Sequence, residues 1–219
     1  MSDTIFALAS AAGRAGVAVI RLSGPATGPV LQRLTGRKLP TPRRASLRRL
    51  SDPIDGSVLD DGLILWFPGP ASFTGEAMAE KQLHGGRAVI AGVLAAVGRC
   101  PGLRPAEPGE FTRRAVLNGK LDLTAAEGLA DLVAAETAMQ RRQALRQLDG
   151  ALGRLYRGWA DRLTGVLAES EAAIAFPDED LPSGLEQNRN IAVRALLVEI
   201  DSHLQDARRG ERLREGIEI

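Results

Sequence analysis

The sequence has a single cysteine, Cys100, and only two histidines, His84 and His203. One cysteine excludes a disulfide within the chain and any zinc site built from several cysteines. The two histidines lie far apart in the sequence, and no cysteine–histidine cluster with metal-ligand spacing accompanies them. We therefore predict no metal site, and we interpret Cys100, which lies among apolar residues, as a buried structural thiol.

Long apolar runs and a strong excess of one charge are also missing. The uncharged stretch at residues 88–98 is far shorter than the roughly 18–20 residues of a membrane span, and the first residues lack the basic segment of a signal peptide. The 28 basic and 27 acidic residues leave a net charge of +1, which excludes an overall basic footprint for nucleic acid. With 44% hydrophobic residues in 219, the chain has the composition of one large or two small globular domains. We expect no membrane partner and a cytoplasmic location.

Positive charge is concentrated in one segment, residues 33–49, which contains seven basic residues and no acid. Such a run is either a solvated loop or an RNA-facing patch, and the loop is the interpretation we favour. Lysine is scarce, so each one stands out. The three lysines are Lys38, Lys81 and Lys120.

Common catalytic motifs are absent. At Gly119-Lys120 a Walker A motif would need glycine where Arg114 stands and serine or threonine where Leu121 stands. The chain is therefore predicted to have no P-loop. The zinc-protease motif HExxH and the hydrolase motif GxSxG do not occur either.

The first part of the chain, residues 1–118, is predicted to be a mixed α/β domain. Strands are expected at residues 16–22, 63–67, 77–83 and 103–106, with a turn at 60–62. Helices are expected around residues 30–34, at 88–97 and from 108 to 118, where Asn118-Gly119 is a typical left-handed stop.

The rest of the chain, residues 119–219, is predicted to be helical. Thr124 and Glu127 have the spacing of a capping box, which predicts a helix running towards Gly150. Two further apolar stripes, at residues 152–174 and 191–204, are separated by a break at 176–180. The last stripe is expected to end at Gly210, and residues 215–219 read as the start of a strand. The fold class is therefore α+β, with an α/β domain followed by an incomplete all-α bundle.

Four polar side chains near strand ends and turns are candidates for a small-molecule pocket. Arg21 lies in an apolar strand, so its charge must pair, reach solvent or meet an anion. Glu80 is either on the solvated face of a strand or in the pocket, and His84 either finishes a turn or binds. Lys120 either complements a helix C-terminus or binds a ligand.

Ordered motifs along the whole chain resemble those of the bacterial tRNA-modification GTPase family MnmE, also called TrmE. They include Asp3-Thr4-Ile5-Phe6-Ala7, Ser72-Phe73-Thr74-Gly75-Glu76, His84-Gly85-Gly86, Pro108-Gly109-Glu110-Phe111-Thr112, Leu117-Asn118-Gly119-Lys120-Leu121-Asp122-Leu123 and Phe176-Pro177-Asp178-Glu179. One departure is Ser10-Ala11-Ala12, where the family usually has Thr-Pro-Pro.

The resemblance implies a tetrahydrofolate-binding domain similar to that of the glycine-cleavage T-protein. It also implies that this domain forms a homodimer and binds 5-formyltetrahydrofolate. The positions that match the family's folate contacts are Arg21, Glu80 and Lys120. A carboxylate suits the donor–acceptor edge of a pterin, which favours Glu80. Arg21 or Lys120 would then neutralise the anionic glutamyl tail.

The resemblance also implies a Ras-like G domain beyond this chain, which uses GTP, magnesium and potassium. With a flavin-dependent partner, MnmG (GidA), the family modifies C5 of the wobble uridine in tRNA. We therefore expect no catalytic residue in this chain, and we expect the helices at 152–174 and 191–204 to leave an apolar flank uncovered. The alternatives are a stand-alone folate-dependent aminomethyltransferase and a non-catalytic dimerisation scaffold.

Overall fold

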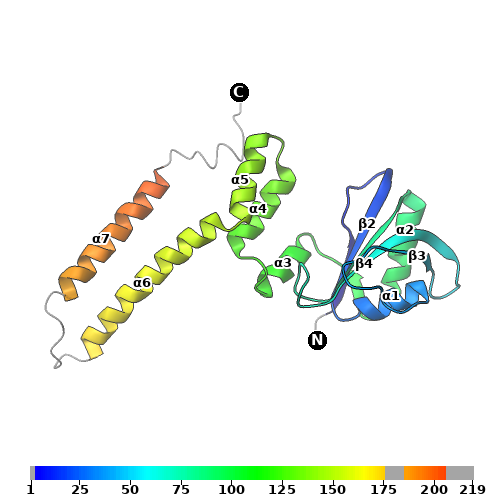
Figure 1. Ribbon diagram of the computed structural model, residues 1–219, viewed down its shortest axis with the longest axis horizontal. Helices are drawn as coiled ribbons and strands as arrows, with labels where there is room; N and C mark the ends of the chain where they lie inside the picture. Colours follow the sequence, from blue (N-terminus) through cyan, green and yellow to red (C-terminus); the bar gives the residue numbers. More distant parts are fainter. Residues whose placement is uncertain (1–2, 176–184, 206–219) are drawn as a thin grey trace. The chain divides into compact units, whose positions relative to one another are not determined.

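The computed structural model describes residues 3–175 and 185–205 (Figure 1). The chain forms two compact units, Met1–Leu121 and Asp122–Ile219. The first is a mixed α/β domain with a six-stranded sheet and the second is helical, which confirms the predicted fold class. No helix in the described parts of the chain is both long and apolar enough to span a bilayer.

The sheet of the first unit has the strand order β3-β4-β5-β2-β1-β6. Its strands pair antiparallel, except that β1 and β6 are parallel. The strands are β1 Thr4–Leu8, β2 Ala15–Ser23, β3 Ser46–Ser51, β4 Val58–Phe67, β5 Met78–Gly85 and β6 Leu103–Pro105. The helices are α1 Thr27–Thr35, α2 Arg87–Gly98 and α3 Glu110–Leu117.

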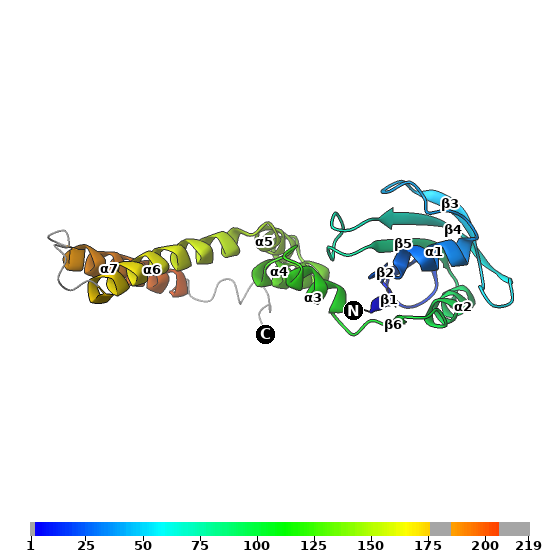
Figure 2. The same ribbon diagram turned by 90° about the horizontal axis from the view of Figure 1, so that it is seen from below.

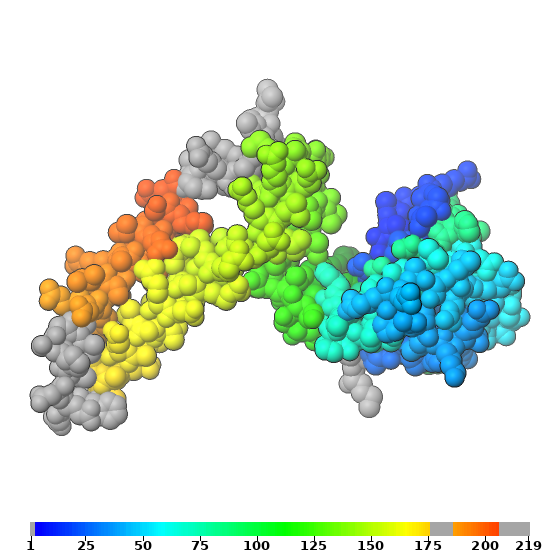
Figure 3. Space-filling view, viewed as in Figure 1, coloured from blue at the N-terminus to red at the C-terminus, as the bar shows by residue number. Residues whose placement is uncertain are grey.

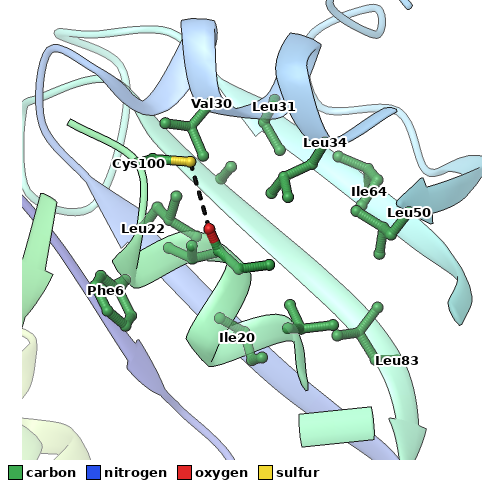
Figure 4. Packing of buried hydrophobic residues seen from close by; sticks show 14 of the residues in the cluster. Phe6, Ile20, Leu22, Val30, Leu31, Leu34, Leu50, Ile64, Leu83 and Cys100 are labelled. Carbon is green, nitrogen blue, oxygen red and sulfur yellow. Dashed lines mark hydrogen bonds between the residues drawn. The ribbon is translucent and has the colours of Figure 1, made fainter. Parts of the chain in front are cut away.

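The core lies between the sheet and the two helices α1 and α2, and the strands curve around α1 (Figure 2). Because strand side chains alternate between faces, one face of the sheet supplies the core (Figure 4). Cys100 is buried in this core, as predicted, and its Sγ donates to the Ala96 carbonyl at 3.5 Å. The core strand residues include Ile20, Leu22, Leu50, Ile64, Trp66, Ala79 and Leu83.

The opposite face of the sheet is apolar in part and is not covered by α1 or α2. Leu63 of β4 pairs with Leu47 of β3 on one side and with Gln82 of β5 on the other. The side chains of Leu47 and Leu63 are 70% and 38% exposed. Glu80, two residues from Gln82 along β5, lies on the same face.

Several predicted elements of the first unit are confirmed with small changes of boundary: β2, the second half of β4, β5, β6 and all three helices. Gly36 ends α1 with φ of 62°, and Gly119 follows α3 with φ of 67°. Both are left-handed positions that glycine adopts without strain. Strand β1 was not predicted.

The predicted turn at residues 60–62 is wrong, because these residues lie inside β4 and pair with β3. Asp61 forms an ion pair with Arg49 at 2.9 Å. A Cβ on Gly62 would lie 2.6 Å from the Gln82 carbonyl oxygen, so the glycine is needed for close strand approach rather than for a turn. The same pairing makes the end of the basic segment a strand, where we predicted a loop.

Within its described residues the second unit contains four helices, one more than predicted: α4 Leu123–Ala134, α5 Ala138–Leu148, α6 Ala151–Ala175 and α7 Leu185–Leu204. The predicted capping box at Thr124 is wrong. The N-cap of α4 is Asp122, whose Oδ1 accepts from the Ala125 N–H at 2.8 Å and from the Thr124 hydroxyl. The predicted helix towards Gly150 is interrupted before Thr137, which forms a capping box with Gln140 and starts α5.

The two apolar stripes are confirmed as α6 and α7, which lie side by side (Figures 1 and 3). Trp159 Nε1 donates to Glu199 Oε1 at 3.0 Å across this pair, and Leu196 is buried. Leu163 and Leu197 are more than half exposed, so part of the expected apolar flank is uncovered in the described helices. The predicted break at 176–180, the end at Gly210 and the strand at 215–219 lie outside the described residues.

Candidate functional site

A cavity of about 390 Å³ opens beside the ends of β4 and β5 in the first unit. Its volume is in the range of small-molecule sites, about 300–1,000 Å³. Two cations and one acid line it together with apolar and small side chains. The lining residues are Arg43, Phe67, Ala71, Ser72, Phe73, Met78, Glu80 and Lys120.

One wall of the cavity is the loop at residues 68–77, which joins β4 to β5 and is tied to other segments by hydrogen bonds. The buried Thr74 hydroxyl is 2.7 Å from Ser23 Oγ, at the end of β2. Asn118 Nδ2, just after α3, donates to the Thr74 carbonyl at 2.7 Å. Gly75 has φ of 80° and lies so close to Asn118 that a Cβ would be 3.1 Å from the Asn118 Cβ. The loop is therefore held in one conformation from two sides.

A charged network anchors the same loop to α3. Glu76 accepts from Ser23 Oγ at 2.7 Å and from Arg114 Nη1 at 3.1 Å. Arg114 Nη2 also donates to Glu110, which is 3% exposed and accepts from Arg104 at 2.6 Å. The hydrogen bonds from the Arg104 guanidinium hold the pKa of Glu110 at about 2, well below its ordinary 4.5. This network positions the cavity wall rather than lining the cavity.

Glu80 is oriented by Arg21, its direct neighbour across the β2–β5 pairing. Arg21 Nε and Nη2 donate to the same oxygen, Glu80 Oε1, at 3.0 and 2.7 Å. Glu80 Oε2 accepts no hydrogen bond from the described residues, so one carboxylate oxygen is left to a ligand. The Glu80 side chain is 22% exposed, and it is therefore paired rather than freely solvated.

Arg21 itself is held in place by two aromatic rings. Its guanidinium carbon lies 5.8 Å from the centre of the Phe73 ring and 5.7 Å from that of Phe111, within the range of cation–π attraction. Because its charge is matched by Glu80 and it does not line the cavity, Arg21 acts as a positioning residue for the carboxylate.

Lys120 reaches the cavity because of the way α3 ends. Its backbone N–H donates to the Ala115 carbonyl at 2.8 Å, which closes the helix at the left-handed Gly119. The Lys120 Nζ donates to the Pro70 carbonyl at 3.0 Å. The structure thus brings Glu80 and Lys120 to one cavity, with Arg21 directly behind Glu80.

His84 does not line this cavity. Its Nδ1 is 2.7 Å from Asp60 Oδ1, and its backbone N–H donates to Asp60 Oδ2 at 2.8 Å. His84 therefore finishes β5 in contact with β4. The groups of acidic, cysteine and histidine residues in the described ranges include none that could hold a metal ion.

Arg43 lines the cavity, although its sequence position predicted only that it belongs to the basic segment at residues 33–49. It is the one non-glycine residue with positive φ, 60°, among the described residues. Its guanidinium lies 5.9 Å from the centre of the Phe67 ring and donates to the Ala71 carbonyl. The signal in the sequence was the run of arginines, which gave no means of telling Arg43 from its neighbours.

Comparison with known proteins gives two family matches that together cover nearly the whole chain. The family described as "GTP-binding protein TrmE N-terminus" matches residues 4–120, and "MnmE helical domain" matches residues 123–218.

Similar curated proteins cover this chain from end to end. The chain is 62% identical to the human "5-taurinomethyluridine-[tRNA] synthase subunit GTPB3, mitochondrial" over 218 residues. This match covers 99% of this chain and 44% of that protein. It is also 62% identical to the "tRNA modification GTPase MnmE" of Paramagnetospirillum magneticum over 219 residues, a match that covers 100% of this chain and 49% of that protein. The chain thus spans about half the length of the curated relatives it matches.

Proposed function

Because the chain belongs to the MnmE (TrmE) family of tRNA-modification GTPases, we propose that its first unit binds a 5-formyltetrahydrofolate-type one-carbon donor in the cavity lined by Glu80 and Lys120. The observation that carries this proposal is the Glu80 carboxylate, which has one oxygen fixed by Arg21 and one left over at the cavity. A pterin ring presents a row of N–H donors that such a carboxylate binds strongly. The glutamyl tail of folate is anionic and pairs with a cation such as Lys120.

The whole protein is proposed to act on tRNA. In this proposal it uses GTP, magnesium and potassium in a G domain outside this chain, and works with the flavin-dependent partner MnmG to modify C5 of the wobble uridine. A cytoplasmic location belongs to the same proposal. The failed Walker A match at Gly119-Lys120 supports the expectation that this chain by itself binds no GTP.

We further propose that the first unit forms a homodimer. The uncovered face of its sheet, with Leu47 and Leu63 exposed, supports this, because exposed apolar patches mark interaction surfaces. Light scattering over a dilution series should show a dimer at tens of micromolar, and a strictly monomeric chain would contradict it.

Folate binding is tested by calorimetry with 5-formyltetrahydrofolate and the variants Arg21→Ala, Glu80→Ala and Lys120→Ala. Loss of a charged hydrogen-bond partner costs about 1.5–3 kcal/mol, so the Glu80 variant should bind about ten- to hundredfold more weakly. Glu107→Ala is the matched control, because its carboxylate is 62% exposed and does not line the cavity. Wild-type affinity in all three variants would contradict the site, and a wild-type chain that binds no folate would favour the scaffold function.

A further inference from the structure

Two cations at the cavity are held by neighbouring carbonyl groups of one loop. Lys120 Nζ donates to the Pro70 carbonyl at 3.0 Å, and the Arg43 guanidinium donates to the carbonyl of the next residue, Ala71. Both side chains line the cavity, although they come from segments far apart in the sequence. The loop therefore gathers two positive charges at one place.

Neither cation is neutralised by an acid. No ion pair of Arg43 or Lys120 with an Asp or Glu occurs among the described residues, in contrast to Arg21, whose charge is matched by Glu80. A carbonyl uses only one of the five guanidinium N–H donors and one of the three ammonium donors. The remaining donors are left to solvent or to an anion in the cavity.

The backbone fixes the direction of Arg43. Its φ of 60° is a conformation that non-glycine residues rarely adopt, and its N–H donates to the Trp66 carbonyl at 2.8 Å. The guanidinium then lies over the Phe67 ring, beside the cavity. Unusual backbone conformations of this kind cluster at ligand-binding sites.

We propose that Arg43 is a second cation for the folate glutamyl tail and binds one of its two carboxylates beside Lys120; this rests on the proposed folate function, which already assigns Lys120 to the tail and Glu80 to the pterin. The cavity has two unpaired cations and one acid, which fits a ligand with two anionic groups and one donor edge. Arg43 offers a planar fork that matches a carboxylate, and Lys120 offers a compact point charge. Arg21 differs from these two cations, because its charge is matched by Glu80 and it does not line the cavity.

The test compares Arg43→Met with Arg44→Met by calorimetry on the full chain. Arg44 is the next residue, is also exposed and does not line the cavity. Methionine keeps an unbranched apolar stem and the same backbone constraint at position 43, and it removes the guanidinium and its charge. The two ligands are 5-formyltetrahydrofolate and a 5-formyltetrahydropterin that lacks the aminobenzoyl-glutamate tail.

Arg43→Met should weaken binding of the tailed ligand about ten- to hundredfold, leave binding of the tail-less pterin within about twofold, and be largely rescued by Arg43→Lys, which restores the charge. Arg44→Met should change neither affinity. Unchanged affinity of Arg43→Met for the tailed ligand, with wild type binding it, would overturn the assignment of Arg43 alone. An equal loss for both ligands without rescue by lysine would also overturn it, since the variant would then have damaged the cavity. No folate binding by wild type would overturn the folate function as well.

Discussion

Replacing Lys81 with methionine should stabilise the first unit. Lys81 lies on β5 between the core residues Ala79 and Leu83, and it pairs across the sheet with Ile20 and Ile64. It is 0% exposed, and its Nζ has no hydrogen-bond partner among the described residues. An ammonium group in such surroundings is costly, because it has lost its water and gained no counter-charge.

The size of the effect follows from the pKa of this amine. Burial lowers the pKa of Lys81 from its ordinary 10.5 to about 7. At ~1.4 kcal/mol for each pKa unit, this difference corresponds to roughly 5 kcal/mol of lost stability below neutral pH. Because the folded state holds fewer protons than the unfolded state between the two pKa values, stability should rise with pH across that window.

The free energy of unfolding is measured in urea with Trp66 fluorescence as the probe of the first unit, in a Trp159→Phe background. From about pH 7 to about pH 9 the parent chain should gain about 2–3 kcal/mol. Lys81→Met should be more stable by roughly 3–5 kcal/mol at neutral pH and should lose most of that pH dependence. Lys38→Met, at an exposed lysine, is the matched control and should change little.

Two results would refute this reasoning. If Lys81→Met were less stable than the parent at neutral pH, the amine would be contributing favourable contacts. If the parent and the variant showed the same pH dependence, Lys81 would be titrating near its ordinary pKa and its burial would be incomplete in solution.

Two further predictions concern other buried contacts. Glu110→Gln should lower the free energy of unfolding by about 3 kcal/mol in urea, because it leaves Arg104 and Arg114 without their shared carboxylate. This loss should shrink as the pH falls from 4.5 to about 2, where the parent carboxyl also becomes neutral; a loss that does not depend on pH would contradict the assigned charge. In α6, Gly153→Ala should destabilise the helical unit by about 1–3 kcal/mol in thermal melts, because the new Cβ would lie 2.3 Å from Asp122 Oδ2. Gly158→Ala, where a Cβ meets nothing within 4 Å, should stabilise it by up to about 1 kcal/mol, and equal effects of the two changes would contradict this packing.

The fold was predictable where the local pattern and the tertiary context agree. Apolar runs bounded by glycine and proline identified β2 and the second half of β4, a loose alternation of apolar residues identified β5, and the apolar periodicity identified α6 and α7. The turn at residues 60–62 failed because Asp60 and Asp61 have partners on other strands, which no local rule reveals. The break between α4 and α5 contains no glycine or proline, and the signal that marks it is the Thr137–Gln140 capping box.

The candidate site was predictable in its acid and one cation, but not in its assembly. Glu80 and Lys120 were identified as polar residues near strand ends and turns, and the resemblance added their folate role. Their relation to Arg21 depends on the β2–β5 register, which joins residues 59 positions apart. The position of Arg43 depends on a left-handed backbone at a non-glycine residue, which sequence patterns do not mark, and on the Ala71 carbonyl, which lies 28 positions further along the chain.

The loop at residues 68–77 joins contributions from β2, from the segment before β3, from β5 and from the end of α3. The cavity therefore depends on segments that span residues 23–120, most of the first unit. A ligand bound there would stabilise the unit as a whole by mass action, by about 2.7 kcal/mol at a hundredfold excess over its dissociation constant. Because the ligand would bind only the folded unit, occupancy of the cavity and folding of the sheet are thermodynamically linked. The gain is of the same order as the cost of burying Lys81.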